Sequence, residues 1–302
     1  MNLTWESRSC PLCGSTAEGK VIVESNVEPS RLTEFAFASR KLPEYMHSRM
    51  VECRDCGLLY GNPAVSIESG LNAYKEAAFD SGQESRFAAQ TYARLIADQL
   101  KSTGSHEKAL DIGAGDGAFL EQLVQLGFQS ITGVEPSAAP IASSKPDVRN
   151  LIRHDIFRAR DFEGQRFDLV TCFQIMEHLW NPVELVSSVN SILKPGGLFV
   201  TVTHNLQAFS ARMLGDKSPI FDIEHLQLFS EKTIRALLQR AGFTDIRVMP
   251  VWNRYPIHYW MKLAPLPQSL KRALIKVTKQ GPLATISCSL PAGNIAAVAR
   301  KT

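Results

Sequence analysis

Short apolar runs recur between residues 108 and 204, and each ends on or beside a polar residue. The runs at 108–112, 130–135 and 167–173 are typical of buried strands, whereas residues 118–127 carry apolar side chains at helical spacing. This alternation predicts an α/β domain with a mostly parallel sheet. Ligands bind such sheets at the carboxyl ends of the strands. The polar residues expected there are Asp111, Glu135, Asp155, Gln174 and His204.

The first run passes into a glycine-rich turn with glycines at 113, 115 and 117. Glycine tolerates positive φ and lets the backbone approach a ligand closely. Alone this is a weak signal, because dinucleotide-binding enzymes use a similar turn. The second strand, however, ends in Glu135, 24 residues after Asp111. A carboxylate there can accept from both hydroxyls of a ribose, and an acid at Asp155 can accept from an exocyclic amine.

In this order, the motifs resemble those of the class I S-adenosylmethionine (SAM)-dependent methyltransferases, over roughly residues 90–302. The resemblance implies a seven-stranded Rossmann-like sheet with helices on both faces and SAM as the cofactor. It assigns the methionine end of SAM to Asp111, Gly113, Gly115 and Gln174, the ribose to Glu135, and the adenine to Asp155 and Ile156.

Two Cys-x-x-Cys pairs, Cys10 with Cys13 and Cys53 with Cys56, stand 39 residues apart near the N-terminus. Each pair can place two thiolates on one metal ion, and four sulfurs complete a tetrahedral zinc site. Disulfides between these cysteines are the alternative, but they are uncommon in intracellular proteins. We therefore expect a small zinc-ribbon-like module that holds a structural Zn²⁺.

The chain divides into three predicted parts. Residues 1–65 form the zinc-binding module, and residues 66–100 form a linker with helices that cover the substrate. Residues 101–302 form the methyltransferase domain, with a basic insert at about 253–292.

Methyl transfer from a sulfonium is an in-line displacement, and a hydroxyl or carbon acid acceptor must lose a proton to a base. Histidine suits this role because its pKa is close to neutrality. The candidates are His178, His204 and His225, which follow strand ends or lie in substrate-side loops. Glu177 precedes His178 and Glu224 precedes His225, so each histidine has an acidic neighbour.

A Cys-rich front end joined to such a domain also resembles bacterial sugar C-methyltransferases. That resemblance implies catalytic roles for Glu224, His225 and His178 around a sugar. Those enzymes carry a further C-terminal domain that is not expected in these 302 residues, which disfavours C-methylation. The sequence does not otherwise decide between O-, C- and N-methylation.

The Glu177–His178 stretch also resembles ubiquinone-pathway O-methyltransferases, in which a Glu-x-x-Glu-His pattern can bind a divalent metal. Gln174 replaces the first glutamate here, which disfavours a catalytic metal.

The net charge of +3 hides an asymmetry. Residues 246–302 contain nine of the 33 Lys and Arg residues and no Asp or Glu, which leaves 24 basic against 30 acidic residues before them. Within this region the stretch 266–279 has the pattern of a basic amphipathic helix. The insert at 257–279 either packs on the domain or contacts a membrane surface or a protein partner.

The function expected from these features is methylation of a small hydroxylated metabolite in polysaccharide or secondary-metabolite biosynthesis, with a sugar, nucleotide sugar or lipid-linked sugar as the acceptor. An RNA methyltransferase and an inactive scaffold are the alternatives. A nucleic-acid partner is disfavoured because residues 1–65 hold seven basic and eight acidic residues. No apolar run is long enough to span a membrane and the first residues are unlike a signal peptide, so a cytoplasmic enzyme is expected, with peripheral membrane contact as an option. The sequence does not indicate an oligomeric state.

Overall fold

A central sheet organises the computed structural model, which describes residues 3–33, 35–37, 45–79, 82–101, 106–263, 268–278 and 286–302. Its order is β12 (Asp245–Pro256), β13 (Ser287–Arg300), β10 (Leu193–His204), β9 (Phe167–Phe173), β6 (Lys108–Ile112), β7 (Ser130–Glu135) and β8 (Ile152–His154). The strands from β10 to β8 pair in parallel, whereas β13 is antiparallel to both of its neighbours. The predicted Rossmann-like fold is thus confirmed as a mixed sheet.

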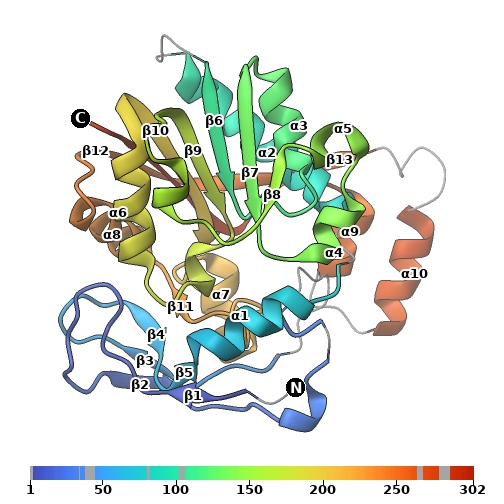
Figure 1. The fold of residues 1–302 in the computed structure, drawn as a ribbon. Coiled ribbons are helices and arrows are strands. Elements are labelled where there is room, and N and C mark those ends of the chain that lie inside the picture. The colour runs from blue at the N-terminus through green and yellow to red at the C-terminus, as the bar shows by residue number, and fades with distance from the viewer. Residues whose placement is uncertain are drawn as a thin grey trace.

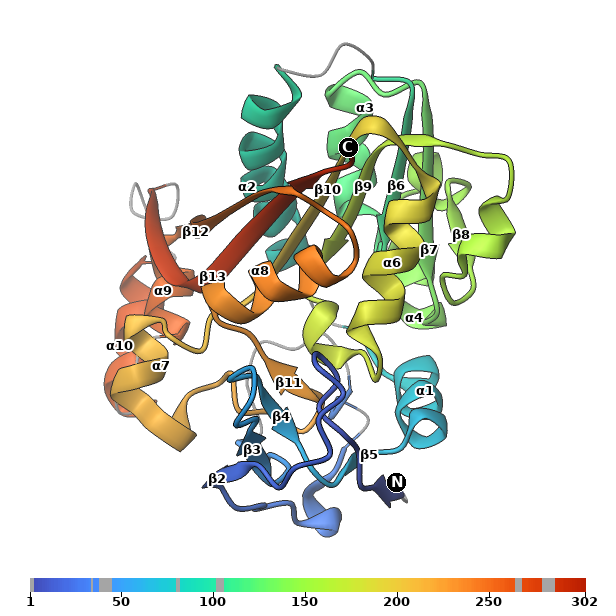
Figure 2. The same cartoon turned by 90° about the vertical axis from the view of Figure 1, so that its left-hand side faces the viewer.

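Helices cover both faces of this sheet because successive strand residues point to opposite sides. Leu110 of β6 packs in one core with residues of α6 (Pro182–Ile192) and α8 (Glu231–Arg240). Ala109 packs in a second core with residues of α2 (Gly82–Leu100) and α3 (Ala118–Gln125). Figures 1 and 2 show α6 and α8 on one side of the sheet and α2 and α3 on the other.

The last two strands, β12 and β13, both extend into the basic insert expected at about 253–292. Their pairing runs from Asp245 opposite Arg300 to Pro256 opposite Ser287, with one irregularity between Pro250 and Trp252. The start of the expected basic insert is therefore part of the sheet. It continues into α9 (Ile257–Leu263) and α10 (Gln268–Thr278), and the predicted helical positions 266, 267 and 279 lie outside the described residues.

A second sheet, in the order β11 (Gln227–Leu228), β4 (Leu59–Gly61), β3 (Met50–Glu52) and β2 (Lys20–Val23), belongs mainly to the N-terminal segment. Only β11 comes from the loop after β10, so a distant segment completes this sheet. Nearby, β1 (Trp5–Glu6) pairs with β5 (Ala64–Val65), and α1 (Ile67–Glu76) follows. Figure 1 shows the parallel strands pointing toward α1 and these N-terminal strands, which places their polar carboxyl ends at this junction.

The described part of the chain also contains the short helices α4 (Ala138–Ser143), α5 (Pro146–Arg149) and α7 (Phe209–Leu214), with 3₁₀ turns at Pro29–Arg31, Ala159–Phe162, Met176–His178 and Gly215–Lys217. Within the same ranges, none of the helices combines the length and the apolarity needed to cross a membrane.

Candidate functional site

A cavity of about 690 Å³ lies at this junction and is lined by the strand ends, α1 and the loop before β11. Its volume is within the range of small-molecule sites. Of the predicted cofactor and catalytic residues, the cavity brings together Asp111, Gly113, Gly115, Glu135, Ile156, Gln174, His178, Glu224 and His225.

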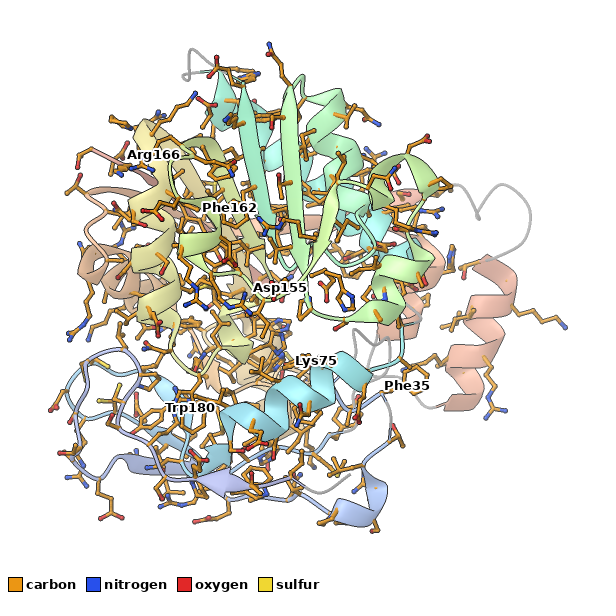
Figure 3. All side chains as sticks on the ribbon, in the orientation of Figure 1. Phe35, Lys75, Asp155, Phe162, Arg166 and Trp180 are labelled. Carbon is orange, nitrogen blue, oxygen red and sulfur yellow. The ribbon has the colours of Figure 1, made fainter. Side chains whose placement is uncertain are left out.

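Asp155 does not belong to this lining, in contrast to the expected adenine contact. Its two carboxylate oxygens each accept from the guanidinium of Arg158 at 3.0 Å, and its side chain is 42% exposed. Figure 3 labels Asp155 just past the end of β8, above α1. The neighbouring Ile156 does line the cavity.

The glycine turn and Glu135 form a single hydrogen-bonded unit. The backbone N–H of Gly115 donates to Oε2 of Glu135 at 3.0 Å, and that of Ser137 donates to Oε1 at 2.8 Å. Burial raises the pKa of Glu135. Gly113 has φ +78°, and a Cβ there would lie 2.5 Å from Cδ1 of Ile175. No other residue fits at Gly113 without displacing that wall of the cavity.

Asp111 is fully buried at the end of β6. Burial raises its pKa to about 7, although its Oδ1 accepts a hydrogen bond from Oγ1 of Thr171 at 2.6 Å. The negative charge of Glu135 raises the pKa of Asp111 further. A cationic ligand group beside Asp111 would favour its ionised form.

Gln174 adopts the left-handed conformation, with φ +55°, directly after β9. Non-glycine residues seldom adopt this conformation, and such outliers cluster at functional sites. Its backbone N–H donates to the carbonyl of Val202 at 2.7 Å. Its side-chain Nε2 is buried and makes no hydrogen bond within the described part of the protein, so it can donate to a ligand acceptor such as a carboxylate.

Three histidines meet in the cavity: His178 comes from the turn after β9, His204 from the end of β10 and His225 from the loop before β11. The ring of His225 lies 5.0 Å from that of His178 and 4.9 Å from that of His204, centroid to centroid. Nδ1 of His225 lies 2.7 Å from the carbonyl oxygen of Ile220. A carbonyl oxygen can only accept, so Nδ1 carries the proton, and Nε2 holds the lone pair of the neutral ring.

Two glutamates accompany these histidines. Oε2 of Glu224 lies 3.7 Å from Nδ1 of His178. Glu177 is fully buried, and its Oε2 accepts from Oγ1 of Thr203 at 2.9 Å. Its Oε1 has no hydrogen-bond partner among the described residues. Ligand atoms of Glu177, His178 and His225 lie within 4.8 Å of one another, so this cluster could also hold a cation.

Several cavity residues are not among those assigned to the site from the sequence, although Tyr74 lies in the segment expected to cover the substrate. The side chain of Tyr74 on α1 contacts His178, and its backbone carbonyl accepts from Oγ of Ser137 at 2.7 Å. Tyr255 and Tyr259 reach the cavity from the expected basic insert, and burial raises the pKa of Tyr255 to about 12. Nothing in the periodicity of residues 253–292 indicates these contacts, because they depend on the extension of β12.

The four N-terminal cysteines lie together, as expected. Sγ of Cys10 is 3.5 Å from Sγ of Cys56, and Sγ of Cys13 is 3.5 Å from Sγ of Cys53. All four thiols are free. Equivalent turns hold the two pairs, because Gly14 donates to the carbonyl of Cys10 and Gly57 donates to that of Cys53.

Comparison with known proteins identifies the family and the fold of this chain. A family model described as a methyltransferase domain matches residues 83–248, more than half of the chain. The ubiquinone biosynthesis O-methyltransferase of Coxiella burnetii (strain Dugway 5J108-111) is 30% identical over 129 residues, which are 40% of this chain and 54% of that relative. The enzyme of the same name from Pseudomonas aeruginosa (strain LESB58) is 31% identical over 120 residues, or 36% and 50%. The chain thus spans about half the length of the curated relatives it matches.

Among solved structures, the plantazolicin methyltransferase BpumL in complex with a pentazolic desmethylPZN analog and S-adenosylhomocysteine (SAH) matches with a TM-score of 0.51. The two chains are 18% identical, and the match covers 74% of this chain and 88% of that one. At this identity, the likeness shows a shared fold.

Proposed function

Because the chain belongs to the family of SAM-dependent methyltransferases, we propose that it methylates a hydroxyl group of a small metabolite with His225 as the general base. The contact between Nδ1 of His225 and the carbonyl of Ile220 carries this proposal, because it makes Nε2 the basic nitrogen of the neutral ring. As the acceptor oxygen attacks the methyl carbon, the bond from that carbon to the sulfonium sulfur breaks. SAH leaves, and the hydroxyl proton passes to Nε2 of His225.

The proposed cofactor contacts occupy the other side of the cavity. The ammonium of the methionine moiety would lie beside Asp111, its carboxylate beside Nε2 of Gln174, and the ribose hydroxyls beside Glu135. Ile156 would contact the adenine. This arrangement is supported by the buried carboxylates and by the unpartnered donor of Gln174.

We propose a hydroxylated metabolite as the methyl acceptor. The name O-methyltransferase of the relatives favours oxygen as the methylated atom. Their names give no support to the sugar, nucleotide sugar or lipid-linked sugar that the sequence suggested. Aromatic rings of Tyr74, Trp180, Tyr255 and Tyr259 line the cavity, and Tyr74 contacts His178, so the cavity suits a ring that carries hydroxyl groups.

The test is transfer of a labelled methyl group from SAM to a panel of phenols and nucleotide sugars. Replacement of His225 by Gln should slow transfer by roughly 10²- to 10⁴-fold, the usual contribution of a general base. His106→Gln serves as the matched control, because His106 stacks on Phe128 and does not line the cavity. Equal rates in wild type and His225→Gln, or no transfer to any hydroxylated acceptor, would contradict the proposal.

A divalent cation at Glu177, His178 and His225 is a second candidate feature. It is favoured by the buried Oε1 of Glu177, which accepts no hydrogen bond among the described residues and lies 3.9 Å from Nε2 of His204. Bound there, a cation would stabilise the ionised acceptor oxygen. Titration with Mg²⁺ separates the two mechanisms. Saturable activation that Glu177→Gln abolishes supports the cation, whereas Mg²⁺-independent activity supports His225 alone.

The four cysteines are proposed to hold a structural zinc ion. A tetrahedral site with Zn–S bonds of about 2.3 Å has sulfurs about 3.8 Å apart, close to the two separations of 3.5 Å. Metal analysis should find one zinc ion per chain. Cys53→Ser should lose the ion and lower the melting temperature, whereas Cys288→Ser, a change outside the cluster, should retain it. Zinc retention by Cys53→Ser would overturn this assignment.

A further inference from the structure

Exposed apolar side chains concentrate on two parts of the chain. Of the twelve large hydrophobic side chains that are exposed among the described residues, seven belong to α7 or to residues 246–302. They are Phe209, Met213, Trp252, Leu270, Val277, Ile286 and Leu290. Phe209 and Met213 on α7 are the most exposed of the twelve, at 79% and 68%. Single exposed apolar residues are ordinary, but a concentration of this kind marks an interaction surface.

Helix α10 is amphipathic, with exposed apolar side chains and basic side chains, as helices that lie in a membrane surface are. It packs along α9 and buries Thr278. Leu270 and Val277 are two turns apart, so they share one exposed stripe. The partly exposed Lys271 and the exposed Lys276 lie about 100° to either side of that stripe, whereas Arg272 lies on the opposite side of the helix. Apolar side chains flanked by basic ones are typical of helices that lie in a bilayer surface.

All charged side chains of residues 246–302 are basic. Residues 246–302 carry nine Lys or Arg and no Asp or Glu. Three of the nine, Arg247, Arg300 and Lys301, lie at the end of β12 and β13 that is remote from α9, and the other six belong to the part of the chain between them. The complementary partner is anionic. Exposed Trp252 and the apolar residues of α7 and α10 favour a lipid surface over a nucleic acid, because a phosphate backbone offers nothing to bury them.

These elements lie on one side of the molecule. Figure 2 shows α7, α9 and α10 along the same edge, and Figure 1 shows α7 and α10 apart from each other, so together they span a broad face. Tyr259 of α9 also lines the cavity. The same face therefore borders the active site.

We propose that this basic face, made of α7, α9, α10 and the adjoining ends of β12 and β13, docks on a bilayer that contains anionic lipid. The apolar side chains enter the headgroup region, and the basic ones contact lipid phosphates. On the basis of the proposed function, an acceptor with a lipid tail would then reach the cavity from the bilayer past Tyr259.

The test is co-sedimentation of the full-length, zinc-replete chain with vesicles of phosphatidylcholine, alone or with one quarter phosphatidylglycerol. Wild type should bind only the anionic vesicles and should be released by high salt. Each basic residue near an anionic surface contributes roughly fivefold, so Lys271→Glu/Arg272→Glu/Lys276→Glu should lower the partition coefficient by at least about 100-fold. Leu270→Ser/Val277→Ser should also weaken binding.

The control variant is Lys20→Glu/Arg160→Glu/Lys232→Glu, which changes the net charge equally at exposed residues outside the basic face. It should bind anionic vesicles far better than the α10 charge variant. Equal loss in both variants, or wild-type binding that ignores lipid charge, would overturn the proposal. Binding to RNA or to a protein without vesicle binding would overturn it as well. Because vesicle binding needs no methyl transfer, a protein that binds vesicles but methylates nothing counts only against the proposed function.

Discussion

The phenol oxygen of Tyr74 lies 2.7 Å from Nδ1 of His178. Tyr74 belongs to α1, whereas His178 follows β9 of the central sheet. The ring of Tyr74 also packs edge-on against Phe37, at 5.5 Å between centroids. The side chain of Tyr74 thereby connects Phe37 of the N-terminal segment to the histidine cluster.

Replacing Tyr74 by Phe should therefore slow methyl transfer and spare cofactor binding. The change keeps the ring on Phe37 and removes a hydrogen bond worth about 1 kcal/mol, so kcat should fall roughly five- to tenfold. Affinity for SAH should stay within about twofold of wild type. The comparison uses steady-state rates and calorimetry, with Tyr45→Phe as the control at an exposed tyrosine. A parallel loss of SAH affinity would mean that Tyr74 supports the cavity as a whole.

Asp111 should make cofactor affinity depend on pH. Its pKa of about 7 in the free protein leaves it mostly protonated at pH 6 and mostly ionised at pH 8. The ammonium of SAH favours the ionised form, so SAH affinity should rise about tenfold over this interval. Methylthioadenosine, which lacks the amino-acid moiety, should bind with little pH dependence. Asp111→Asn should flatten the SAH profile, and a slope that survives this change would point to another group.

Of the two residues that the sequence assigned to the adenine, Ile156 lines the cavity and Asp155 does not. Asp155 is paired with Arg158 outside the cavity lining, so Asp155→Asn should change SAH affinity less than about threefold. Ile156→Ala removes apolar contact area and should weaken binding about five- to tenfold. The two variants are compared by calorimetry. If Asp155→Asn were the weaker binder, the carboxylate would have to leave Arg158 to hold the adenine.

The parts of the fold that could be predicted are those that depend on the pattern of residues close together in the sequence. The strand ends carrying Asp111 and Glu135 follow from short apolar runs, and the cysteine cluster follows from its paired spacing. The carboxylate of Glu135 accepts a hydrogen bond from the amide of Gly115 in the glycine turn, and its contact with the ribose stays a prediction.

Features that depend on long-range pairing could not be predicted. Gln227 and Leu228 complete the N-terminal sheet by pairing with Tyr60 and Leu59, and no local signal joins those segments. Strand β12 extends to Pro256, although the sequence predicted that an insert begins at about residue 253. This extension brings Tyr255 to the cavity. By contrast, the pair of Asp155 and Arg158 is only three residues apart, so the sequence did contain a signal for it.

In the proposed site, Glu135 binds the cofactor, whereas His225 acts as the base and does not bind it. Calorimetric titration with SAH tests this claim most directly. It compares the zinc-replete wild type with Glu135→Ala and His225→Gln. We expect micromolar binding by wild type, binding reduced at least about 100-fold in Glu135→Ala, and unchanged binding in His225→Gln. No binding by the folded wild type, or an equal loss in both variants, would contradict the proposed site.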